Sequence, residues 1–113
     1  MTYQEKAYTF AQYTNKEYPF LALGEEAGEV LGKLAKFVRK NHVSVAGAVA
    51  FATDISKSTI RADLIKELGD VQWQLAACCT ELGITLEDIQ NVNIAKLSGR
   101  EVRGTIVGDG DER

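Results

Sequence analysis

The sequence predicts an all-α fold, in which four helices form one bundle and residues 1–113 make up a single domain. Apolar residues recur at helical spacing in four segments of the chain. Thr2 with Glu5, and Thr85 with Asp88, have the spacing of capping boxes at helix starts. Only one proline, Pro19, interrupts these segments.

The first two helices are expected on either side of Tyr18-Pro19. The first should run from Tyr3 to about Glu17, where proline removes a backbone donor and restricts the residue before it. The second should cover about residues 20–40, with carboxylates and lysines opposite its apolar arc, so the core and the site are expected on opposite sides of this helix. The apolar arc consists of Leu23, Ala27, Val30, Leu31, Leu34 and Val38.

Residues 41–58 form an insert whose structure the pattern leaves open. It is small and apolar without a polar face, and fits a short helix capped by Ser44, a covering loop or an interface segment. His42 is the only histidine, and a structural or solvent-facing role is expected because nothing nearby makes a nucleophile with it.

The third helix is expected over about residues 60–82, capped by Ser58 or Thr59 and ended by Gly83. Its carboxylates and Gln74 should face the acids of the second helix. Its buried arc is expected to contain Leu64, Leu68, Val71, Leu75, Cys78 and Leu82.

The fourth helix, at about residues 86–98, places Asn93 and Lys96 beside its apolar stripe, where both need partners. The tail at residues 99–113 is rich in glycine and charge, which alone is typical of a frayed terminus. A second interpretation is that the tail folds back over the site.

Acidic residues gather on two of these helices. Glu25, Glu26 and Glu29 fall within an arc of about 100°, and Glu67 and Asp70 lie about 60° apart on theirs. Like charges this close repel, so a cation is expected between the helices. An all-carboxylate set suits Mg²⁺ or Mn²⁺ better than zinc. The alternative is a solvated acidic face. Glycines at 24, 28 and 32 favour the metal site over the solvated face. Each glycine weakens the helix, and a helix that keeps three of them is expected to let another backbone or a bulky anionic ligand approach closely.

Glu-Glu-x-x-Glu at Glu25 to Glu29, followed by Glu-x-x-Asp at Glu67 to Asp70, resembles the signature of the MazG-like nucleoside triphosphate pyrophosphohydrolases, which are related to dimeric dUTPases. The resemblance covers about residues 18–113 apart from the insert, which is longer than the family's usual spacer. It implies a four-helix MazG-like bundle that assembles into a dimer or tetramer, and hydrolysis between the α and β phosphates for nucleotide-pool housekeeping.

The resemblance also implies roles for individual residues. Glu26, Glu29, Glu67 and Asp70 are the expected Mg²⁺ ligands. Glu25 is expected to act as a ligand through water or as the base, and the catalytic residues are Glu25 and Glu29. Asn93, Lys96 and Arg100 resemble the family's positions that reach the sugar or the phosphates. As fixed cations, Lys33, Lys36, Arg39 and Arg103 are further candidates to hold phosphates, and Trp73 is a candidate wall for the nucleobase. These eight are the expected substrate-binding residues. Trp73 has a second interpretation as a core or interface residue.

The composition of the chain limits the kinds of molecule that it is expected to bind. A net charge of −3 gives no basic excess for nucleic acid, no apolar run reaches the length of a membrane span, and the N-terminus lacks a signal pattern. A cytoplasmic protein acting on a small molecule is expected. Cys78 and Cys79 are expected to be small buried groups without chemistry.

Two rival functions remain. A ferritin-like di-metal oxidase would need Glu-x-x-His pairs, and the chain has one misplaced histidine. A non-catalytic helical interaction module would keep the acidic face as surface, without metal affinity or hydrolysis.

Overall fold

The computed structural model describes residues 1–111 and folds this range into five helices without a strand. The all-α class is confirmed, and the described residues form one helix more than expected. Of the three alternatives for residues 41–58, the short helix capped by Ser44 is the one that forms. The helices are α1 (Tyr3–Tyr8), α2 (Tyr18–Asn41), α3 (Val45–Asp54), α4 (Thr59–Leu82) and α5 (Leu86–Arg103).

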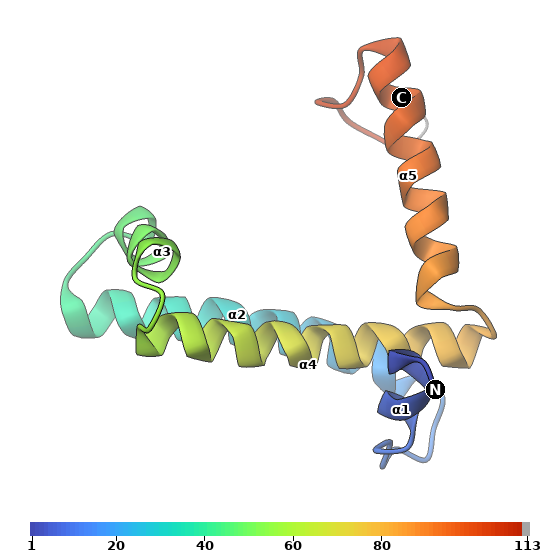
Figure 1. Cartoon of the computed structure of the whole chain (residues 1–113), viewed down its shortest axis with the longest axis horizontal. Helices are drawn as coiled ribbons and strands as arrows, with labels where there is room; N and C mark the ends of the chain where they lie inside the picture. Colours follow the sequence, from blue (N-terminus) through green and yellow to red (C-terminus); the bar gives the residue numbers. More distant parts are fainter. Residues whose placement is uncertain (112–113) are drawn as a thin grey trace.

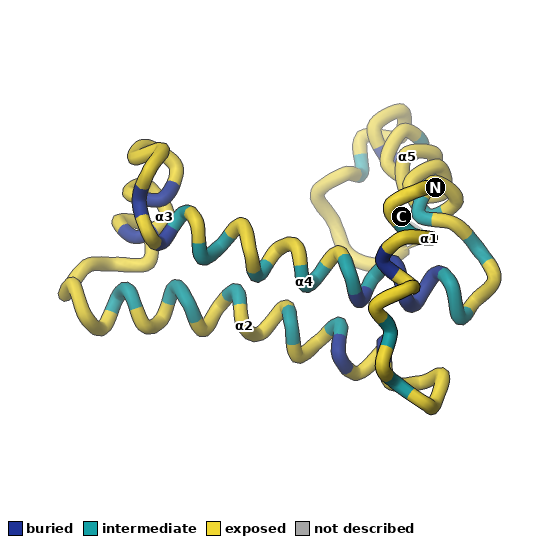
Figure 2. The backbone as a smooth tube through the Cα atoms, turned by 60° about the horizontal axis from the view of Figure 1, so that its bottom comes forward, coloured by how far each residue is buried: buried dark blue, intermediate teal, exposed yellow. Residues whose placement is uncertain are grey.

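α2 and α4 lie side by side as an antiparallel pair (Figure 1). Each has 24 residues, or about 36 Å at 1.5 Å per residue. α3 covers the end at which the chain passes from α2 to α4, and α1 packs against α4 near the other end (Figures 1 and 2). α5 leaves that second end and extends away from the pair (Figure 1). The radius of gyration is 17.2 Å, against about 13 Å for a compact chain of this length.

α1 ends at Tyr8 rather than near Glu17. The hydroxyl of Thr9 donates to a carbonyl of α1 at 2.6 Å, and the side chain of Asn15 accepts from the first amide of α2 at 3.0 Å. Such local bonds between side chain and backbone compete with helix continuation. Residues 9–17 therefore form a loop.

α2 begins at Tyr18, so Pro19 lies in its first turn. A proline is well tolerated there because the first amides of a helix have no helical acceptor. Pro19 thus starts the second helix instead of ending the first.

The buried core is small and lies mainly where α1 and the start of α2 meet the second half of α4 (Figure 2). Leu31, Leu68 and Leu82 were expected in buried arcs, but their exposed fractions are 68%, 55% and 62%. The expectation is wrong for these three, and for Ala27, which is also exposed, because α2 and α4 contact each other along one narrow strip. Buried residues include Ala7, Pro19, Ala22, Ala76, Ala77, Cys78 and Cys79, with Ala48, Ala52 and Ile60 at the α3 end.

α5 starts at the Thr85 capping box and runs to Arg103, several residues beyond the expected end at Ser98. Gly83 ends α4 and Gly104 ends α5, both with φ near +70°, a conformation that favours glycine. None of the helices in residues 1–111 combines the length and the apolar character that crossing a membrane requires.

Candidate active site

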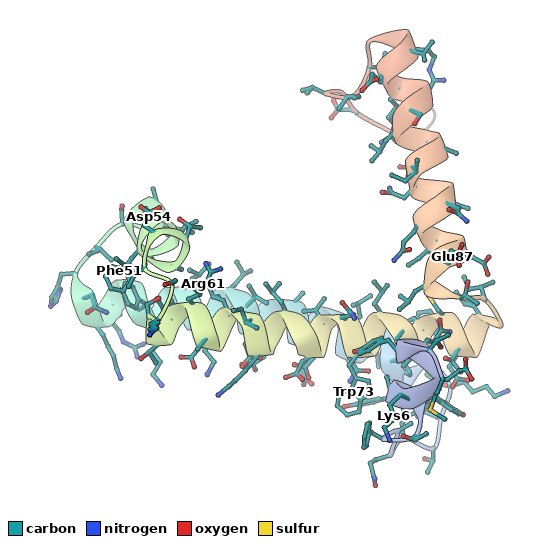
Figure 3. All side chains as sticks on the ribbon, in the orientation of Figure 1. Lys6, Phe51, Asp54, Arg61, Trp73 and Glu87 are labelled. Carbon is teal, nitrogen blue, oxygen red and sulfur yellow. The ribbon has the colours of Figure 1, made fainter. Side chains whose placement is uncertain are left out.

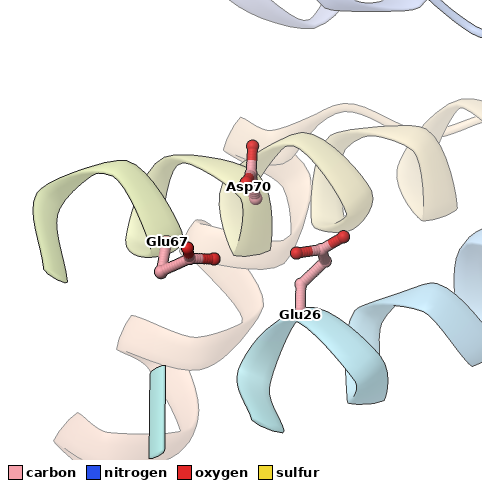
Figure 4. A group of neighbouring side chains, drawn as sticks. All are labelled: Glu26, Glu67 and Asp70. Atoms are coloured by element: carbon pink, nitrogen blue, oxygen red, sulfur yellow. The ribbon is translucent and has the colours of Figure 1, made fainter. Parts of the chain in front are cut away.

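Three carboxylates meet at the middle of the α2–α4 pair (Figure 4). Glu26 of α2 faces Glu67 and Asp70 of α4, and one carboxylate oxygen from each lies within 4.8 Å of the others. All three side chains are half-buried. The structure therefore brings together three of the four residues expected as metal ligands, and we refer to these three as the acidic cluster.

Glu26 lies on the face of α2 that packs against α4. Leu23, Val30 and Lys33 share this face at helical spacing, and all are half-buried. The expectation that core and site occupy opposite sides of the helix is therefore wrong. The expected apolar arc of this helix does not coincide with its packed face, since Leu31, which belongs to the arc, is exposed.

The electrostatics of the cluster favour a cation. Burial raises the pKa of Glu26 above its ordinary value, and the negative charges of Asp70, Glu25, Glu67 and Glu29 raise it further. Nitrogen and sulfur donors are absent from the cluster, so its donor set suits a hard cation such as Mg²⁺ or Mn²⁺.

Glu25 and Glu29 lie beside the acidic cluster on α2. Both are exposed, and neither belongs to the group of three converging carboxylates. Their charges nevertheless act on Glu26, as its raised pKa shows. They remain accessible to water and to a ligand bound over the cluster.

A first cavity, which we call the aromatic pocket, adjoins the cluster on the α1 side. Its volume is about 440 Å³, and Glu26 forms part of its lining together with Tyr13, Tyr18, Trp73 and Gln74. The indole Nε1 of Trp73 donates to the carbonyl of Ala7 in α1 at 3.2 Å, which fixes the ring against that helix (Figure 3). The size and the mixed apolar and polar lining are typical of a small-molecule site.

A second cavity, the lysine pocket, lies between α2, α3 and the start of α4. Its volume is about 470 Å³, and it is lined by Lys33, Lys36, Lys40 and Lys57 around the paired rings of Phe37 and Phe51. The Nζ of Lys33 also lies 3.8 Å from Oε1 of Glu67. This contact joins the lysine pocket to the acidic cluster. Arg39 is exposed and does not line the pocket.

Comparison with known proteins decides the family. The family model described as the MazG nucleotide pyrophosphohydrolase domain matches residues 14–104. The chain belongs to this family. A relative in Mycobacterium phage L5, the Gene 37 protein, is 33% identical over 96 residues, which are 85% of this chain and 75% of that protein. No solved structure matches the chain.

MazG membership agrees with the resemblance seen in the sequence and indicates a nucleotide pyrophosphohydrolase, a class of hydrolase. MazG domains generally depend on a divalent metal, and the acidic cluster offers a place for one. The family name does not specify the substrate, and the name of the phage relative gives no activity.

The expected substrate-binding residues of α5 lie apart from the acidic cluster of their own chain, because α5 extends away from the α2–α4 pair (Figure 1). Asn93 and Arg103 are exposed, whereas Arg100 is only 6% exposed. Arg100 donates to the carbonyls of Gly110 and Asp111, whose carboxylate also pairs with Lys96 at 3.3 Å. The described part of the tail therefore folds onto α5 and not over the cluster; residues 112–113 lie outside the described range.

Sequence reasoning missed three features of the pockets. Helical spacing gives no role to Lys57, which belongs to no helix, and it predicts Tyr13 in a first helix that in fact ends at Tyr8. Gln74 was placed on the correct face of α4, but its burial at the wall of a pocket depends on the loop 9–17. The spacing of residues within α4 cannot predict that a loop distant in the sequence, residues 9–17, packs beside Gln74.

Proposed function

We propose that this chain hydrolyses nucleoside triphosphates, NTP or dNTP, between the α and β phosphates, with Mg²⁺ or Mn²⁺ as cofactor. The products would be a nucleoside monophosphate and pyrophosphate, and the use would be nucleotide-pool housekeeping. The observation that carries the proposal is the position of the acidic cluster between an aromatic pocket and a lysine pocket.

The two pockets suggest how the substrate is oriented across the acidic cluster. Glu26 borders the aromatic pocket, and Lys33 extends from the cluster into the lysine pocket. A nucleotide lying across the cluster would rest its base against Trp73 and direct its terminal phosphates toward Lys33 and Lys36. Arg39, exposed on the same helix, is a further cation for the outermost phosphate.

Glu26, Glu67 and Asp70 would hold the cation, with Glu29 as an additional ligand. A bound divalent cation neutralises phosphate charge and favours attack at phosphorus. The lysines would hold the leaving pyrophosphate. Glu25 or Glu29 would take the proton from the water that attacks the α-phosphorus, while the bond to the bridging oxygen breaks and that oxygen leaves with pyrophosphate.

We also propose that two or four copies associate, so that α5 of one copy reaches the site of another. This arrangement would give Asn93, Lys96, Arg100 and Arg103 a role in substrate binding that their position in a single chain does not allow.

The test is to incubate the protein with a panel of NTPs and dNTPs plus Mg²⁺ and to identify the products. Monophosphate and pyrophosphate are expected, and Glu67→Gln should lower kcat/KM by about a hundredfold or more. The matched control is Glu87→Gln, which removes an exposed acid at the start of α5 and should change little (Figure 3). Diphosphate and phosphate as products would contradict the proposed reaction, and no turnover by the unmodified protein would favour the non-catalytic interaction module.

A further inference from the structure

Gln74 is a buried polar residue that the reaction above does not use. It is 7% exposed and lines the aromatic pocket. Within residues 1–111 its side-chain amide makes no hydrogen bond, and its nitrogen and oxygen are not among the fully enclosed unpaired atoms of this range. The amide therefore reaches the cavity. An amide that faces a cavity and has no partner in the protein is free to pair with a ligand bound there.

Two aromatic residues that line the pocket with Gln74 have their polar groups engaged elsewhere. The Trp73 indole donates to Ala7, and the Tyr13 hydroxyl donates to the carboxylate of Glu81. The rings of Tyr13 and Tyr18 are stacked, with their centroids 6.1 Å apart. The rings of Trp73 and Tyr13 therefore offer flat apolar walls. Gln12, Asn15 and Gln74 are the amide side chains of the lining, and Gln74 is the buried one, so it is the amide best placed to contact an enclosed ligand.

The position along α4 fits a nucleotide. Gln74 follows Asp70 by four residues, which places it one turn and about 6 Å further along the helix, on the same face. A group bound at Gln74 is thus separated from a phosphate at the acidic cluster by a distance that a ribose and its 5′ carbon can span.

We propose that Gln74 is a specificity-determining residue that reads the hydrogen-bonding edge of the nucleobase. The inference rests on the proposed function, because it places the phosphates of the same substrate at the acidic cluster. A glutamine amide presents a donor and an acceptor side by side. It can pair with an adjacent acceptor and donor on a base, one of which belongs to the exocyclic amino or keto group.

The test combines a variant with a substrate analogue. Among the NTPs and dNTPs, the one with the highest kcat/KM is compared with the analogue that lacks its exocyclic amino or keto group. The unmodified protein should prefer the natural substrate by about tenfold, the effect of one or two neutral hydrogen bonds. In Gln74→Met, which keeps the length of the side chain, this preference should fall close to one.

Gln72→Met is the matched control, since Gln72 is exposed on the same helix and lines neither the aromatic nor the lysine pocket. It should keep the tenfold preference. An equal loss for substrate and analogue in Gln74→Met would mean that Gln74 only supports the fold, and would overturn the inference. The analogue alone also tests the contact in unmodified protein, so an absent preference there overturns it without any variant.

A second measurement separates this inference from the proposed reaction. Trp73 is the only tryptophan of the chain and lines the pocket, so its fluorescence reports binding of phosphate-free nucleosides in EDTA. Suppose that the protein shows no hydrolysis but binds the natural nucleoside more tightly than the analogue, and that Gln74→Met loses this difference. That result would support recognition of the base by Gln74 while the proposed reaction fails. Equal binding of both nucleosides by the unmodified protein would overturn base reading even where hydrolysis occurs.

Discussion

Glu26 experiences the strongest electrostatic conflict at the candidate site. Burial and four neighbouring carboxylates raise its pKa, and the Lys33 ammonium is paired with Glu67 rather than with Glu26. Repulsion of this kind destabilises a fold unless a cation offsets it. The sequence spacing of the acids indicated this conflict, but it did not show which of them converge, because that depends on how α2 and α4 face each other.

Replacing Glu26 with glutamine should remove both the repulsion and the metal affinity. Metal-free Glu26→Gln is expected to melt at a higher temperature than the unmodified protein. At 100 times the Kd, Mg²⁺ should stabilise the unmodified protein by about 2.7 kcal/mol, or about 10 °C in Tm, and leave the variant unchanged. Thermal unfolding with and without Mg²⁺ checks both statements, and equal Mg²⁺ stabilisation of the variant would contradict the role of Glu26.

Tyr13 gives the fold an alkaline pH dependence. Burial first, and then the hydrogen bond to Glu81 and the charge of that carboxylate, raise the pKa of Tyr13 above its ordinary value. The folded state therefore keeps the phenolic proton at a pH where the unfolded chain releases it, above about pH 10. Stability should fall as the pH rises through this range, and Tyr13→Phe should show a shallower fall. Urea unfolding at about pH 8 and pH 10.5 measures the difference; identical slopes would contradict it.

At the scale of elements, helix starts were predictable because capping is local. The Thr2 and Thr85 boxes and the Ser58 cap form as the sequence indicates. The length of α1 and the buried arcs were not predictable, because Thr9 and the loop after it compete with the helix, and because only tertiary contact decides which face of α2 meets α4. The aromatic pocket was missed for the same reason.

Gln4 ties α1 to the turn between α4 and α5. Its amide nitrogen donates to Thr80 at 3.1 Å and to the carbonyl of Ile84 at 2.9 Å, and its oxygen accepts from the amide of Leu86 at 2.8 Å. Gln4→Ala should lower the free energy of unfolding by about 2–3 kcal/mol, since partly buried backbone groups lose their partners. Urea unfolding measures this, and Gln72→Ala on the surface of α4 is the control. A loss no greater than the control's would show that water replaces these bonds.

At the scale of the whole molecule, the chain exposes more surface than a folded monomer of its size. Its accessible surface is 8131 Å², against about 6,100 Å² expected, and the excess exceeds the roughly 800 Å² that one partner buries in a standard interface. Leu31 and Ile65 on the two long helices are each more than half exposed. These values support the proposal that copies associate.

Leu31→Glu combined with Leu68→Glu should therefore shift the protein toward monomers. A charge at two exposed apolar sites opposes association without disturbing the small core of the chain. Light scattering at several concentrations gives the mass. Val107→Glu in the tail, where the side chain is 98% exposed, should leave the mass unchanged. A double variant that remains the size of the unmodified protein would place the interface elsewhere.

The three carboxylates come from two helices, and this makes their meeting a matter of register. One turn of an α-helix advances about 5.4 Å, more than the 4.8 Å within which the oxygens of Glu26, Glu67 and Asp70 gather. Sliding α2 along α4 by a single turn would thus separate the three carboxylates while leaving both helices intact. The segment from His42 to Ser58 connects the two helices, so its length limits how far one can slide along the other, and the proposed metal site depends on this spacing.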